Sequence, residues 1–212
     1  QAKVFSKEMF SEEQKMFADA ALEYATTRLK PLKDDFKSLN KDLILNIFKE
    51  MGELGFLGVD MPEEYGGSDL DKTTAALVVD YLAFAECGSL LVTLGAHSGI
   101  GTLPIVWYGT EEQKKKYLPK IASGEWLSSY ALTEPNAGSD AMNGETTAYL
   151  NEKGTHYILN GQKIYITNGS WANLCITFAK VNGKMTGFIL DKDCKGWVIG
   201  AEEKKMGIKG SS

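Results

Sequence analysis

The chain has 212 residues, of which 43% are hydrophobic, so it can bury a substantial core and is not expected to be disordered. Its net charge of -5 and its single arginine, Arg28, argue against a nucleic-acid partner and against paired arginine clamps on phosphate. No apolar stretch approaches the roughly 18 residues that span a bilayer, so no transmembrane segment is expected.

The first half of the chain, residues 10–122, has helical periodicity. Ser11 and Gln14 form a capping box, which predicts the start of a first helix that Pro31 ends. A second helix is indicated by apolar residues at the spacing i, i+3, i+4, i+7 before Gly52 and Gly55 end the pattern. This apolar stripe consists of Ile44, Ile47, Phe48 and Met51.

Further helix signals follow in the same half. Asp71 can cap a third helix that runs to Glu86, and residues 90–100 suggest a fourth. Thr110 and Gln113 form a second capping box at the start of a helix that leads toward Pro119. We therefore predict that residues 1–124 form an all-α helical bundle.

The second half of the chain changes to a period of two. Residues 155–159 and 162–166 flank Asn160-Gly161, a dipeptide that favours a tight hairpin turn. Asn182-Gly183 separates residues 174–181 from 185–190 in the same way. The fold class predicted is α+β, in which the bundle is followed by an antiparallel, β-barrel-like domain over residues 125–212. The boundary is placed at Ser123-Gly124.

Signatures of the common nucleotide and metal sites do not occur. The sequence has no Gly-x-Gly-x-x-Gly motif after a strand and no Walker motif. With only His97 and His156 available, a histidine-based metal site is not expected, and His97 is interpreted as a structural residue of a helix surface or core. Cys87, Cys175 and Cys194 lie far apart, which argues against zinc or disulfides and favours a reducing compartment.

The segment that carries chemistry is the polar loop 130–140. It follows a predicted strand, has a turn-forming Pro-Asn-Ala-Gly centre, and offers backbone N–H groups together with the hydroxyls of Thr133 and Ser139. From the residues alone, this loop is equally a structural loop at a sheet edge or a functional one.

The loop resembles the first signature of the acyl-CoA dehydrogenase family. The matching residues are Ala131, Leu132, Thr133, Glu134, Ala137, Gly138, Ser139 and Asp140. Residues 160–169 are similar to the family's second flavin-contacting strand, with Tyr165 where tryptophan is commoner, and Asn143 also departs from the family pattern. Blocks at 61–67, 108–110 and 113–119 extend the similarity over most of the chain.

The resemblance implies FAD as the cofactor and the α,β-dehydrogenation of an acyl-CoA thioester to a trans-2-enoyl-CoA, as in fatty-acid β-oxidation. Backbone groups around Leu132 and Thr133 would bond the flavin, the Thr167 hydroxyl would lie near N5, Tyr165 would pack on the ring, and Ser139 would reach the FAD pyrophosphate and the acyl-CoA. The residues expected to bind FAD are Tyr130, Leu132, Thr133, Gly138, Ser139, Tyr165, Ile166 and Thr167.

By the same resemblance, the family's catalytic glutamate lies in a C-terminal helical domain that this sequence lacks, so no catalytic residue is expected in the chain. Glu134 is expected to order its own loop. Residues 90–101 and 202–209 resemble the very-long-chain branch of the family. Gly95, Ala96 and Gly99 would then leave room for a long acyl chain, although the glycines fit equally a close approach of helices.

Partners and compartment follow from the resemblance as well. Electrons would pass to electron-transfer flavoprotein, the assembly would be a homodimer or homotetramer, and the compartment would be bacterial cytoplasm or the mitochondrial matrix. Three alternatives stay open: a short- or branched-chain dehydrogenase, a related oxidase or flavin monooxygenase, and a paralogue that acts as an assembly factor for a respiratory complex.

Overall fold

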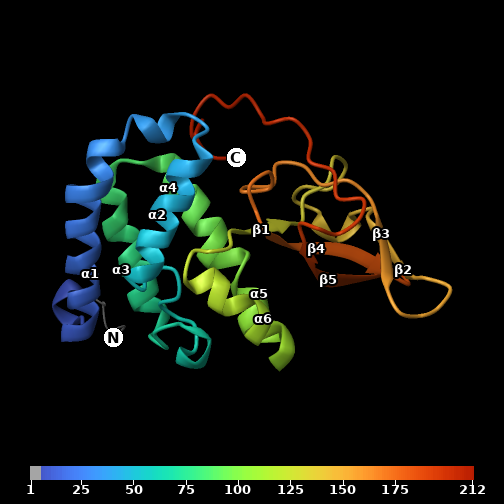
Figure 1. The fold of residues 1–212 in the computed structure, drawn as a ribbon, viewed down its shortest axis with the longest axis horizontal. Helices are drawn as coiled ribbons and strands as arrows, with labels where there is room; N and C mark the ends of the chain where they lie inside the picture. The colour runs from blue at the N-terminus through green and yellow to red at the C-terminus, as the bar shows by residue number, and fades with distance from the viewer. Residues whose placement is uncertain (1–5) are drawn as a thin grey trace, which may run out of the picture.

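The computed structural model describes residues 6–212 and shows a helical part followed by a sheet (Figure 1). The α+β fold class predicted from the sequence is confirmed. The principal helices are α1 (Glu12–Tyr24), α2 (Lys41–Glu53), α3 (Lys72–Leu82), α4 (Gly88–Leu94), α5 (Leu103–Tyr108) and α6 (Glu111–Ala122). Two of them continue as wider helical turns, η2 (Ala25–Leu29) after α1 and η7 (Gly95–Ile100) after α4.

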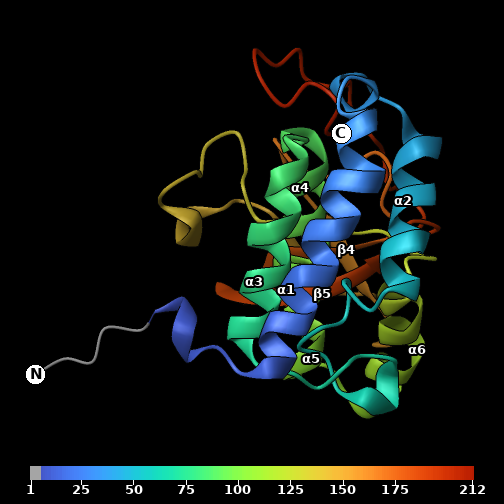
Figure 2. The same cartoon turned by 90° about the vertical axis from the view of Figure 1, so that its left-hand side faces the viewer.

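Both predicted capping boxes are confirmed. The Ser11 hydroxyl accepts from the Gln14 N–H at 3.1 Å, and the Gln14 side chain accepts from the Ser11 N–H at 3.0 Å. Thr110 and Gln113 repeat the arrangement at the start of α6. Each box satisfies two N–H groups that a helix start otherwise leaves without partners, and α1 then packs along α3 (Figure 2).

The core has two parts. The predicted stripe of α2 faces the first, where Ile44, Ile47, Phe48 and Met51 are at most 2% exposed. In the second, Ile105 of α5 and Ile121 of α6 pack against Leu174 and Ile176 of the sheet. The helical part is therefore joined to the sheet by shared apolar packing.

The apolar run around α4 corrects one expectation. Among the described residues, the helical run Gly88–Tyr108, with 21 residues, is long and apolar enough to cross a membrane by length and composition alone. The expectation that no apolar stretch approaches this length is therefore wrong for this run. Half of its most apolar 18-residue stretch is buried inside the fold, and a core helix of this kind passes the same test of length and composition.

The sheet has five strands around a long central one. They are β1 (Ser128–Ala131), β2 (Thr147–Leu150), β3 (Tyr157–Asn160), β4 (Leu174–Val181) and β5 (Lys184–Asp191). One edge of β4 pairs along its whole length with β5. The other edge pairs with β1 over residues 174–177 and with β2 at Lys180. Strand β3 pairs with β2 on the outside of the sheet.

The sheet is mixed and open, which corrects the expectation of an antiparallel barrel. Strands β1 and β2 both run parallel to β4, whereas β5 and β3 are antiparallel to their neighbours. Parallel pairing needs long connections, and residues 132–173, which lie between β1 and β4, supply one. The hairpin predicted at Asn182-Gly183 is confirmed, and both residues take the positive φ that its turn requires.

The hairpin predicted at Asn160-Gly161 is wrong. Strand β3 ends at Asn160, and residues 161–164 form no strand. Gly161 is needed for a close approach instead, because a Cβ atom there would lie 2.3 Å from the Thr146 hydroxyl oxygen. Strand β3 turns back onto β2 through residues 151–156.

The last residues return from the sheet to the helices, as the red segment in Figure 1 shows. The Gly210 N–H donates to the Ser89 hydroxyl of α4 at 3.1 Å, and the Ser212 carbonyl accepts from the Asn168 N–H at 2.9 Å. We call this contact of residues 210–212 with α4 and Asn168 the chain-end clasp. It ties the two halves together, and the domain boundary at Ser123-Gly124 stays a prediction.

Candidate functional site

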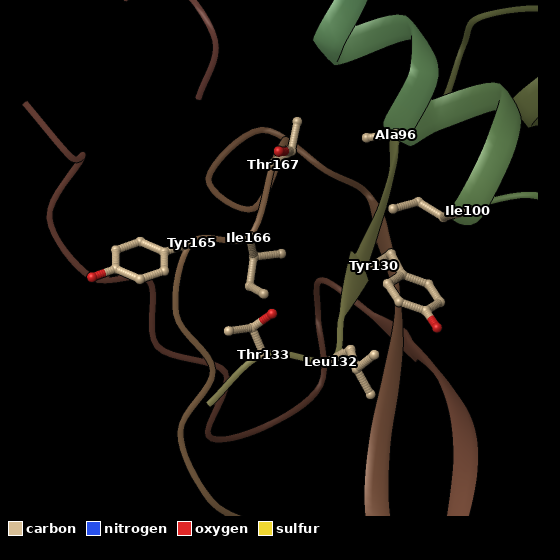
Figure 3. Close-up of a pocket in the computed structure, with 8 residues that line it drawn as sticks. All are labelled: Ala96, Ile100, Tyr130, Leu132, Thr133, Tyr165, Ile166 and Thr167. Carbon is tan, nitrogen blue, oxygen red and sulfur yellow. The ribbon is translucent and has the colours of Figure 1, made fainter. Parts of the chain in front are cut away.

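A cavity of about 240 Å³ lies where η7 faces the end of β1 and the segment after β3 (Figure 3). Six of its eight lining residues are among the predicted cofactor contacts, and a seventh, Ala96, is a predicted substrate contact. The lining consists of Ala96, Ile100, Tyr130, Leu132, Thr133, Tyr165, Ile166 and Thr167.

The segment 161–169 is an irregular loop and not the strand that was expected. Tyr165 and Asn168 both have left-handed backbone conformations, with φ of 57° and 66°. These two turns bracket Ile166 and Thr167 and direct them toward the cavity. Tyr165 is among the residues that line the cavity, but it is 72% exposed, and its ring lies apart from the other labelled side chains in Figure 3.

The two walls of the cavity are joined directly. The Ile164 N–H donates to the Thr133 carbonyl at 3.0 Å. The Lys163 ammonium donates to the Leu132 carbonyl at 3.1 Å and pairs with the Glu134 carboxylate at 2.6 Å. These contacts fix Leu132 and Thr133 relative to the loop that carries Ile166.

Glu134 orders its own loop, as predicted. Its carboxylate accepts from the N–H groups of Glu145 and Thr146 in addition to Lys163. Burial alone would raise the pKa of Glu134, but these hydrogen bonds outweigh it and lower the pKa to about 2. The carboxylate is therefore ionised and fully engaged, which does not suit a catalytic base.

Asn168 anchors the other end of the loop. It is fully buried, and its amide donates to the carbonyls of Thr93 in α4 and Ser128 in β1, at 3.0 and 3.1 Å. Because both partners are acceptors, the amide nitrogen must be the atom that faces them. One side chain therefore connects the loop to a helix and to the sheet.

His97 is a satisfied core histidine, one of the two structural positions expected for it. It is fully buried on η7, accepts from the Ser128 N–H at 3.1 Å, and faces the Ile121 carbonyl at 3.2 Å. Because the Ile121 carbonyl can only accept, Nε2 carries a proton, and because Nδ1 accepts from the Ser128 N–H, the imidazole is neutral. Burial lowers the pKa of His97 to about 4, with the bond to Ile121 opposing the shift.

Several polar groups of the cavity residues form no hydrogen bond with the described part of the protein. Within residues 6–212, the backbone N–H groups of Leu132 and Thr133 and the hydroxyls of Thr133 and Thr167 make no hydrogen bond to the protein. The surrounding side chains of Ala96, Ile100 and Ile166 are apolar. A planar ligand with hydrogen-bonding atoms along one edge, such as a flavin ring, fits this combination of donors and apolar surface.

Four predicted residues lie outside this cavity. Gly138 and Ser139 are exposed further along the loop after β1. Gly95 and Gly99 are on η7, but a Cβ atom at either position would meet open space. Ile100 lines the cavity and was missed, although its spacing of four residues from Ala96 places both on one helix face and could have revealed it.

Family profiles match both halves of the chain. The acyl-CoA dehydrogenase N-terminal domain matches residues 11–125, and the acyl-CoA dehydrogenase middle domain matches residues 129–212. Together they cover the six principal helices, all of the sheet except Ser128, and every residue of the cavity. The resemblance drawn from the sequence motifs is confirmed.

Relatives and solved structures agree with the profiles. A probable acyl-CoA dehydrogenase of Bacillus subtilis is 50% identical over 99% of this chain and 35% of its own length. A crystal structure of an acyl-CoA dehydrogenase complexed with FAD from Bacillus anthracis is also 50% identical, with a TM-score of 0.94 over 99% of this chain and 36% of that one. The chain spans about a third of the length of these relatives.

Relatives with different substrate names are equally similar. The human very long-chain specific enzyme is 36% identical over 96% of this chain and 33% of its own length. A short-chain specific enzyme of Clostridium acetobutylicum is 38% identical over 94% of this chain and 53% of its own. Overall sequence identity therefore does not distinguish a short acyl substrate from a long one. The chain belongs to the acyl-CoA dehydrogenase family of oxidoreductases.

Proposed function

We propose that the protein binds FAD in the described cavity and dehydrogenates an acyl-CoA to a trans-2-enoyl-CoA. The observation that carries this proposal is the set of free N–H and hydroxyl groups at Leu132, Thr133 and Thr167, held at an apolar wall in a chain of this family. The structure of the Bacillus anthracis relative contains FAD, which supports the choice of cofactor.

The chain's own residues would position the flavin. When bound, FAD supplies an acceptor for the β-hydrogen as hydride while a base removes the α-proton of the thioester. The N–H groups of Leu132 and Thr133 would bond the polar edge of the ring and stabilise negative charge there. Thr167 would donate its hydroxyl to the ring, and Ser139 would reach the pyrophosphate and the acyl-CoA. The base is proposed to lie outside these 212 residues.

Flavin binding can be tested with the purified full-length protein. Thr133→Ala and Thr167→Ala should each weaken FAD binding by about threefold to tenfold, because each removes one hydrogen bond. Titration of the apoprotein with FAD, followed by flavin fluorescence, measures this. Thr155→Ala, in the exposed turn before β3, is the matched control and should bind like the wild type. A colourless protein that refuses added FAD would refute the proposal.

We further propose a long acyl substrate, on the evidence of Ala96. This small residue lines the cavity from η7, so a bulky replacement would fill space that the acyl chain needs. Ala96→Phe should lower kcat/KM for a C16 acyl-CoA by about tenfold while a C4 substrate is affected less. Steady-state kinetics with both substrates checks this.

The neighbouring Gly95 provides the control for that experiment. Its added methyl group would point into open space, so Gly95→Ala should leave C16 turnover near the wild-type value. An equal loss of C16 turnover in both variants would place the acyl chain along the exposed side of η7, beside Gly95 and Gly99. Unchanged C16 turnover in Ala96→Phe would exclude the chain from the Ala96 wall.

Electron-transfer flavoprotein is the proposed acceptor, and bacterial cytoplasm or the mitochondrial matrix is the proposed compartment. Bacterial and mitochondrial relatives support both settings. A homodimer or homotetramer is proposed as the assembly. Stopped-flow reoxidation of the reduced protein separates a dehydrogenase from an oxidase, because rapid reaction with O2 would favour the oxidase.

A further inference from the structure

The Lys163–Glu134 ion pair is the most buried one in the described part of the chain. The two side chains are 11% and 5% exposed, and their charged atoms are 2.6 Å apart. Several other pairs, such as Lys37–Asp34, lie on the surface. A buried pair is costly to desolvate, and its contribution depends on the contacts that surround it.

The two charged groups of the pair differ in their contacts with the cavity wall. Its ammonium end bonds the carbonyl of Leu132, a residue of the cavity wall. Its carboxylate end accepts from the N–H groups of Glu145 and Thr146, which do not line the cavity. Neither side chain lines the cavity itself, but the ammonium is bonded to a residue of the cavity wall, whereas the carboxylate is bonded to residues outside it.

The pair also fixes the positions of the two cavity walls relative to each other. Lys163 comes from the loop that carries Ile166 and Thr167, whereas Leu132 and Glu134 flank Thr133 on the opposite wall. The adjacent bond from the Ile164 N–H to the Thr133 carbonyl runs between the same two segments. A shift of Lys163 would move the free donors of both walls relative to each other.

We propose that the Lys163–Glu134 pair is a positioning element for the flavin and also sets the charge that the flavin experiences, with the ammonium on the cavity side. This inference rests on the proposed binding of FAD in the cavity. A nearby positive charge favours a reduced flavin and a nearby negative charge disfavours it, and a partly buried site screens both weakly.

The two ends of the pair therefore have opposite effects on the reduction potential of bound FAD. Lys163→Met leaves the carboxylate behind the wall without its counter-charge, so the potential should become more negative. Glu134→Gln leaves the ammonium without its counter-charge, so the potential should become more positive. A purely structural pair would give changes of the same sign, because either variant would loosen the same contact.

The experiment uses the full-length protein loaded with FAD. The potential is measured by spectroelectrochemical titration for the wild type, Lys163→Met, Glu134→Gln and the double variant, and the visible flavin spectrum is recorded for each. The double variant should return toward the wild-type potential. Lys37→Met and Asp34→Asn, which break an exposed pair, are the controls and should leave the potential unchanged.

A conservative variant keeps the test decisive if Lys163→Met does not fold or loses its flavin. Lys163→Arg retains the charge and should keep a potential close to the wild type, while Glu134→Gln should still raise it. Shifts of the same sign in the two single variants, or no shift in Glu134→Gln, would overturn the inference. Failure of the wild type to bind FAD would instead refute the proposed function.

Discussion

Replacing Asn168 with alanine is expected to destabilise the fold by about 3 to 5 kcal/mol. The change removes the amide that satisfies the buried carbonyls of Thr93 and Ser128, and each unsatisfied group costs about 1 to 3 kcal/mol. It also places alanine at a φ of 66°, where asparagine is tolerated better. Urea unfolding followed by tryptophan fluorescence measures the loss.

A second asparagine provides the matched control. Asn182 has a φ of 49° in the hairpin between β4 and β5, but it is exposed and bonds no buried carbonyl in the described chain. Asn182→Ala should therefore cost only the backbone contribution, about 1 to 2 kcal/mol. Equal losses in the two variants would show that the Asn168 amide contributes nothing to stability.

His97 is expected to make the protein sensitive to mild acid. Burial lowers its pKa from 6.5 to about 4, so the folded state binds its proton less tightly than the unfolded state does. Stability is therefore complete above pH 6.5 and falls as the pH drops toward 4. Over these 2.5 pH units, at about 1.4 kcal/mol each, the loss is on the order of 3 kcal/mol.

The variant His97→Gln isolates this effect. Glutamine does not titrate, so the stability advantage of the wild type at neutral pH should shrink by about 3 kcal/mol between pH 6.5 and 4. Urea unfolding at each pH checks this, with His156→Gln at an exposed position as control. A parallel decline in wild type and His97→Gln would contradict the assignment of His97.

Glu134 acts in a separate range of pH. Its pKa is lowered from 4.5 to about 2, so its contribution is complete above pH 4.5 and is lost only as the pH falls toward 2. Acid unfolding should therefore show the contribution of His97 first and that of Glu134 second. The Glu134→Gln variant proposed for the potential measurements would also test the lower range of pH.

Local signals identified most of the elements from the sequence. The capping boxes at Ser11 and Thr110, the apolar stripe of α2 and the Asn182-Gly183 turn each depend on residues within a few positions of one another. Such contacts form wherever the rest of the chain lies, which explains why these predictions are confirmed.

Contacts between residues far apart in the sequence, such as strand pairing, could not be predicted from these local signals. Asn160-Gly161 has the composition of a hairpin turn, yet its glycine is required by the proximity of Thr146, the residue just before β2. The parallel pairing of β1 with β4 likewise depends on residues more than forty positions apart. Period and turn chemistry indicate that strands exist but do not state which strands pair.

The candidate site was predictable to a similar degree. The resemblance located Leu132, Thr133, Ile166 and Thr167, which the fold does bring together. It did not show that Lys163 connects the walls or that Asn168 anchors the loop, because both roles depend on partners distant in sequence. The high exposure of Tyr165 accompanies a left-handed backbone conformation that no sequence pattern indicated.

The chain-end clasp has a consequence for biosynthesis. Ser89 and Gly210 are 121 positions apart, so their bond cannot form until the ribosome has produced residue 210. The helices can assemble early, because their contacts are mostly local. The loop that carries Asn168 obtains its Ser212 partner only after residue 212 has emerged, so a nascent chain that has just passed residue 169 should not yet hold this loop as the folded protein does.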